Sequence, residues 1–110
     1  MEYRELGRTG QKVSALTLGT MTFGEQNTEA EGHEQMDYAL DQGINIFDAA
    51  EIYPIPPKAA TQDATEEIIG TWLTSRKKRD QVMIATKVAG RSTAIDWLRD
   101  EPILSRQSPE

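Results

Sequence analysis

"NIFDAAEIYP", residues Asn45–Pro54, decides how the rest of the chain is interpreted, because an apolar run stops abruptly on a carboxylate. The run Ile44–Phe47 ends at Asp48, and a tyrosine follows five residues later. The stretch Val82–Gly90, "VMIATKVAG", repeats the pattern and ends its apolar run shortly before Lys87. Both runs are nearly continuous in apolar residues, which is typical of parallel strands covered on both faces. The two stretches therefore predict two neighbouring strands of a parallel sheet.

Helix signals separate these strands. Thr28 and Glu31 stand three residues apart just before a periodic stretch, which predicts a capping box at a helix start. Gly43 is placed to end that helix as the residue after its cap. Asp63 and Glu66 have the same spacing and predict a second boxed helix start before the strand at Val82.

The N-terminal segments complete the topology. Residues 2–6 and 12–16 flank a Gly-containing turn and predict a β-hairpin, and residues 15–20 predict a further strand. The element order is then a hairpin followed by β-α-β-α-β, so the fold class is α/β. Two consecutive βαβ units imply right-handed crossovers and a parallel sheet.

Several polar residues then fall at the carboxyl ends of the strands. Gly19 and Thr20, Asp48 and Lys87 follow the last apolar residues of the three strands, so a parallel sheet brings them to one rim, where active sites lie. We expect Asp48 and Lys87 to be buried there as an ion pair. An ammonium beside the phenol of Tyr53 would make it a stronger acid, suited to protonating a carbonyl oxygen. A purely structural ion pair is the alternative.

These residues also carry a family resemblance. The segments that carry it are "RELGRTGQKVSALTLGTMTFG", "ALDQGINIFDAAEIY", "ATEEIIGTWL" and "MIATKV". By these segments, over roughly residues 3–90, the chain resembles the N-terminal part of an aldo-keto reductase, of the bacterial NADPH-dependent kind. The resemblance implies the first three strands of a (β/α)8 TIM barrel, with the hairpin covering its bottom.

The resemblance also implies a function for the complete enzyme, the NADPH-dependent reduction of aldehydes and ketones to alcohols. By this likeness Tyr53 is the general acid, Lys87 strengthens it, and Asp48 holds Lys87 and adjoins the cofactor. Gly19, Thr20 and Met21 match the loop after the first strand that approaches the nicotinamide. The partner is a small carbonyl substrate.

The chain departs from the family in length. A full barrel needs about 250 residues, and this chain has 110. The family's catalytic histidine follows the fourth strand and its phosphate contacts come mainly from the last strands, which lie beyond this sequence; His33 does not correspond to that histidine. We expect residues 91–110 to be a loop and the truncated start of a third helix. We therefore expect a fragment or truncated product that is inactive alone.

Two other functions remain open. The chain could be a non-catalytic barrel segment that acts by association with other chains, because unpaired strand edges favour pairing with another copy. A small flavodoxin-like domain is a weaker alternative, since residues 20–28 lack a Gly-rich turn leading directly into the helix.

The composition of the chain excludes several kinds of partner and site. A net charge of −6 argues against nucleic-acid or anionic-membrane partners. The chain has no cysteine, which removes disulfides and thiolate metal sites and agrees with a cytoplasmic location. The polar N-terminus has no apolar core of a signal peptide, and no run approaches the roughly 20 apolar residues of a membrane span.

Overall fold

The computed structural model of the chain describes residues 1–90, 95, 97 and 98. Most of the loop and third-helix start predicted over residues 91–110 lies outside the described residues. A two-stranded antiparallel sheet is followed by a three-stranded sheet and two helices. The elements are β1 (Tyr3–Glu5), β2 (Lys12–Ser14), β3 (Leu18–Gly19), α1 (Glu29–Asp41), β4 (Ile46–Asp48), α2 (Ala64–Arg76) and β5 (Met83–Ala85).

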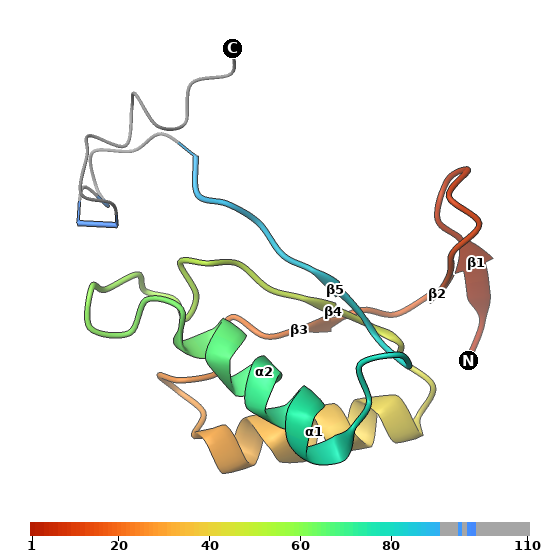
Figure 1. The fold of residues 1–110 in the computed structure, drawn as a ribbon, viewed down its shortest axis with the longest axis horizontal. Coiled ribbons are helices and arrows are strands. Elements are labelled where there is room, and N and C mark those ends of the chain that lie inside the picture. Colours follow the sequence, from red (N-terminus) through yellow and green to blue (C-terminus); the bar gives the residue numbers. More distant parts are fainter. Residues whose placement is uncertain (91–94, 96, 99–110) are drawn as a thin grey trace.

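The hairpin of β1 and β2 stands at one end of the molecule, away from the helices (Figure 1). Polar contacts attach it to the body. The Tyr3 hydroxyl donates to the carbonyl of Gly43 at 2.6 Å, and the Ser14 amide donates to the side-chain oxygen of Asn45 at 2.8 Å. Gly43 has φ +94°, a conformation suited to glycine, and it follows α1 as predicted. The hairpin is thus fixed to the start of β4.

The three-stranded sheet has the order β3-β4-β5, and both pairings are parallel. Gly19 pairs with Asp48, and Asp48 pairs with Ala85, so the three strands end level with one another. This arrangement confirms the predicted hairpin followed by parallel β-α-β-α-β.

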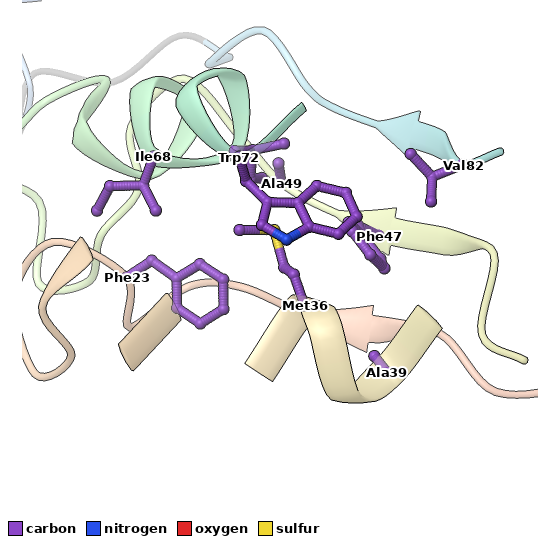
Figure 2. Packing of buried hydrophobic residues seen from close by; sticks show 9 residues of the cluster. Phe23, Met36, Ala39, Phe47, Ala49, Ile68, Trp72 and Val82 are labelled. Carbon is purple, nitrogen blue, oxygen red and sulfur yellow. The ribbon is translucent and has the colours of Figure 1, made fainter. Parts of the chain in front are cut away.

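Both helices lie on the same face of this sheet (Figure 1). Strand order and sequence order agree, so two crossovers of the same hand place their helices on one side. The core lies between sheet and helices, and at its centre the rings of Trp72 and Phe47 pack at a tilt of 56° with 5.5 Å between their centroids (Figure 2). The buried cluster consists of Phe23, Met36, Ala39, Phe47, Ala49, Ile68, Ile69, Trp72 and Val82.

The opposite face of the sheet has no comparable cover among the described residues. Ala85 is exposed and Ile46 is only partly buried. The prediction that the apolar runs of β4 and β5 are covered on both faces is therefore wrong for this part of the chain. Continuous apolar sequence shows that both faces suit burial, but it does not say which segment covers each.

The two helix starts differ. At α1 the predicted capping box is confirmed, because the Glu31 amide donates to the Thr28 hydroxyl at 3.1 Å and the Thr28 amide donates to the Glu31 carboxylate at 2.9 Å. At α2 the predicted box is wrong. Asp63 has φ +71° and makes no side-chain cap, and the Glu66 carboxylate instead accepts a hydrogen bond from the Thr86 hydroxyl next to β5.

Polar contacts also join the two helices. Asp37 accepts from the Trp72 indole N–H at 2.8 Å and from two nitrogens of Arg76, each at 3.0 Å. The hydrogen bond from Arg76, opposed by partial burial, lowers the pKa of Asp37, and the same contact raises the pKa of Arg76. His33 belongs to this interface, since its Nε2 lies 2.9 Å from the Thr71 hydroxyl oxygen. Within the described part of the chain, neither helix is long and apolar enough to cross a bilayer.

Candidate active site

An ion pair lies at the carboxyl ends of β4 and β5. Asp48 is the last residue of β4, and Lys87 follows β5 by two residues. The Lys87 Nζ lies 2.9 and 3.0 Å from the two carboxylate oxygens, so the predicted pairing is confirmed. The hydrogen bond to Asp48, only partly offset by desolvation, raises the pKa of Lys87. The expected burial is wrong here, because the side chains of Lys87 and Asp48 are 51% and 41% exposed.

Tyr53 adjoins this ion pair. The Lys87 Nζ lies 5.2 Å from the centroid of the Tyr53 ring, within the range of a cation–π contact. The tyrosine is partly buried, and its amide donates to the carbonyl of Ala50 at 3.2 Å in the turn after β4. The structure thus gathers Asp48, Lys87 and Tyr53, the three residues for which the sequence predicts catalytic roles. A phenol beside a carboxylate-held ammonium is able to donate a proton to a substrate oxygen.

The last residue of β3 and the two residues after it form the adjoining part of the rim. Gly19 is exposed, and a Cβ built on it would meet no atom within 4 Å. Met21 is 52% exposed, whereas Thr20 is fully buried and its hydroxyl donates to the carbonyl of Asp48 at 2.7 Å. The Thr20 side chain therefore serves the fold, and Gly19 and Met21 present open surface beside the ion pair.

Contacts that the sequence did not predict hold the end of β5. The Glu51 amide donates to the carbonyl of Lys87 at 3.1 Å, and the Glu51 carboxylate accepts from the Ala89 amide at 2.7 Å. Glu51 lies inside the stretch that first indicated the strand, yet these two partners are backbone groups. Residue type and spacing carry no signal for such contacts.

The described residues contain no group of three or more His, Cys, Asp or Glu side chains that could hold a metal ion. Lys87 is the cation placed against Asp48 and Tyr53. The chemistry of this donor set is that of proton transfer and of hydrogen bonding to a carbonyl oxygen.

Comparisons with known proteins find similar sequences. Residues 15–110 match the sequence model of the Aldo/keto reductase family. Protein tas of Escherichia coli (strain K12) is 47% identical over 109 residues, covering 98% of this chain and 32% of that protein. The uncharacterized oxidoreductase YrpG of Bacillus subtilis (strain 168) is 48% identical over 89 residues, covering 80% of this chain and 26% of that protein.

Solved structures extend the likeness to the fold. The holo form of an aldo-keto reductase from Bacillus halodurans superposes with a TM-score of 0.67 at 33% identity, covering 86% of this chain and 28% of that one. A thermostable aldo-keto reductase in complex with the inhibitor epalrestat gives 0.64 at 33% identity, covering 80% and 31%. The predicted fold class, the first part of a TIM barrel, is thereby confirmed. The chain spans about a third of the length of protein tas and about a quarter of the length of YrpG.

Proposed function

Because the chain belongs to the aldo/keto reductase family, we propose that it supplies one side of the active site of an NADPH-dependent oxidoreductase that reduces aldehydes and ketones to alcohols. The observation that supports this most strongly is the contact of Lys87 with both Asp48 and Tyr53 at one rim of the sheet. A cytoplasmic location is part of the same proposal.

In the proposed mechanism Tyr53 gives its phenolic proton to the substrate's carbonyl oxygen as that oxygen gains negative charge. Lys87 stabilises the phenolate that remains, since its ammonium lies against the ring. Asp48 holds the ammonium in place through two hydrogen bonds. When bound, NADPH supplies the hydride that adds to the carbonyl carbon.

The residues that would hold the nicotinamide end of the cofactor are Gly19, Thr20, Met21 and Asp48. Gly19 and Met21 offer open surface there, and the buried Thr20 fixes the backbone between them. These residues would contact one side of the cofactor. Holding two reactants in near-attack geometry is worth roughly 7–11 kcal/mol when fully realised, so we expect the 110-residue chain alone to show no measurable reductase activity.

A chimera tests the proposal. The chain is joined to the remaining two thirds of protein tas, chosen for its 47% identity, and NADPH oxidation is followed with an aldehyde substrate. We expect turnover in the chimera and its loss in Tyr53→Phe, with NADPH affinity by fluorescence titration preserved. Tyr38→Phe is the matched control, because Tyr38 is 68% exposed on α1 and distant in sequence from the rim.

Full turnover in the Tyr53→Phe chimera would refute the role of Tyr53. A folded chimera that binds NADPH but does not reduce aldehydes or ketones would refute the reaction. Low-micromolar NADPH binding by the isolated chain, with turnover removed by Tyr53→Phe, would instead show that several copies assemble a working site.

A second candidate function is a non-catalytic segment that acts by association. It is favoured by the edge positions of β3 and β5 in the three-stranded sheet. The two functions are separated by the chimera, since only the catalytic one requires Tyr53.

A further inference from the structure

Among the described residues, Glu51 makes three connections to backbone groups around the proposed catalytic cluster. It lies between Asp48 and Tyr53 in the sequence. Its amide bonds the Lys87 carbonyl, its carboxylate bonds the Ala89 amide, and its carbonyl accepts from the amide of Asp63 before α2 at 3.0 Å. One residue thus links the turn that leads to Tyr53 with the segment that carries Lys87.

We propose that Glu51 is a positioning residue that sets the backbone of Lys87 and so holds its ammonium against Tyr53. The inference rests on the proposed function, in which the ammonium of Lys87 stabilises the phenolate that remains after Tyr53 has given up its proton. Glu51 itself is not placed in contact with substrate.

Glu51 can act on Lys87 because it lies just beyond the end of the pairing between β4 and β5. The register between β4 and β5 ends at Asp48 and Ala85, and the amide of Ala49 then donates to the carbonyl of Ala85 at 2.9 Å. The next bond in the same direction is the one from Glu51 to Lys87. Two residues further on, the acceptor is the Glu51 carboxylate and not a backbone carbonyl, and the donor is the amide of Ala89. Ala89 is only 9% exposed. Lys87 is therefore held both at its own carbonyl and two residues beyond it.

The ion pair with Asp48 is not enough to hold the Lys87 side chain in one position. It is about half exposed, and exposed ion pairs hold long side chains weakly because ordering a flexible stem opposes the attraction. The backbone position of Lys87 consequently limits how closely the ammonium approaches the ring. A change at Glu51 is expected to alter that approach without removing any atom of the Asp48–Lys87–Tyr53 cluster.

The test uses NMR on the 110-residue chain with isotopically labelled tyrosine rings. The change that Lys87→Met causes in the Tyr53 ring resonances defines the signature of the lost ammonium. We expect Glu51→Ala to reproduce most of this change, and Glu51→Gln, whose side-chain oxygen still accepts from Ala89, to reproduce little of it. Amide exchange of Ala89 is expected to be about tenfold faster in Glu51→Ala, the equivalent of one lost hydrogen bond, and near wild type in Glu51→Gln.

Glu34→Ala is the control, because Glu34 is an exposed carboxylate on α1. If Glu51→Ala does not fold, Glu51→Asp replaces it, since a carboxylate shorter by one methylene no longer reaches the Ala89 amide. Wild-type Tyr53 resonances in Glu51→Ala or Glu51→Asp would overturn the proposal. Resonances that do not respond to Lys87→Met would also overturn it, because there would be no contact to position. The role of Tyr53 is decided separately by the Tyr53→Phe assay of the chimera.

Discussion

The ammonium of Lys87 lies 2.9 and 3.0 Å from the carboxylate oxygens of Asp48, and both side chains are still about half exposed. Exposed ion pairs contribute about 0.2–1 kcal/mol. We therefore expect Lys87→Met and Asp48→Ala each to lower the free energy of unfolding by no more than about 1 kcal/mol, measured by urea unfolding. A loss of about 3 kcal/mol or more for Asp48→Ala would show a buried pair with a stranded ammonium.

Asp37→Ala is expected to lower the free energy of unfolding by more than Lys87→Met or Asp48→Ala. The substitution leaves the indole N–H of the fully buried Trp72 without its acceptor. An unsatisfied buried donor costs about 1–3 kcal/mol. The measurement is urea unfolding followed by tryptophan fluorescence, with the exposed Asp41→Ala on the same helix as control. Equal losses in the two variants would contradict the importance of the indole contact.

The pH dependence of stability should also depend on Asp37. Its pKa is lowered in the folded chain, chiefly by the hydrogen bond from Arg76. A depressed pKa stabilises the folded state above the unfolded-state value of about 3.9, and this stabilisation is lost as pH falls through the folded pKa. Asp37→Asn keeps an oxygen for Trp72 but removes the titration. The stability difference between wild type and Asp37→Asn should shrink on acidification, and a difference that grows would contradict the sign.

Two helical glycines should respond in opposite ways to alanine. Gly70 on α2 is exposed, and an added Cβ would meet nothing within 4 Å, so Gly70→Ala should stabilise by about 0.5–1 kcal/mol. Gly32 on α1 is buried, and its Cβ would lie 3.1 Å from the Phe23 ring and 3.3 Å from Ile68. Both neighbours belong to the core. Gly32→Ala should therefore lower the thermal midpoint, and a rise equal to that of Gly70→Ala would show that the core yields easily.

We expect the isolated chain to associate with itself. β3 and β5 are edges of the three-stranded sheet, and alternation along the strands directs Ile46 and Met83 away from the helices. Sedimentation equilibrium should show a mean mass that rises with concentration. Met83→Lys should reduce this rise, because a charge on the open face opposes pairing. A chain that stays monomeric at all concentrations would contradict the second candidate function, in which the segment acts by association.

The parts of the structure that local signals specify were predictable from the sequence. The capping box at Thr28 joins residues three apart, and the meeting of Asp48 with Lys87 follows from the geometry of parallel strand ends. The box at Asp63 was predicted wrongly because the Glu66 carboxylate is engaged by Thr86, 20 residues away in the sequence. The contacts of Glu51 could not be predicted, because they involve backbone groups and nearly every residue type carries the same backbone groups.

The bond network of Asp37 with Trp72 and Arg76 has a consequence for the chain during synthesis. All of its members lie before residue 77, and so do the β3 and β4 strands that α1 and α2 cover. A chain is synthesised from its N-terminus. The residues that join the two helices are therefore all synthesised before Val82, which completes the core cluster, and before Lys87, which completes the ion pair with Asp48.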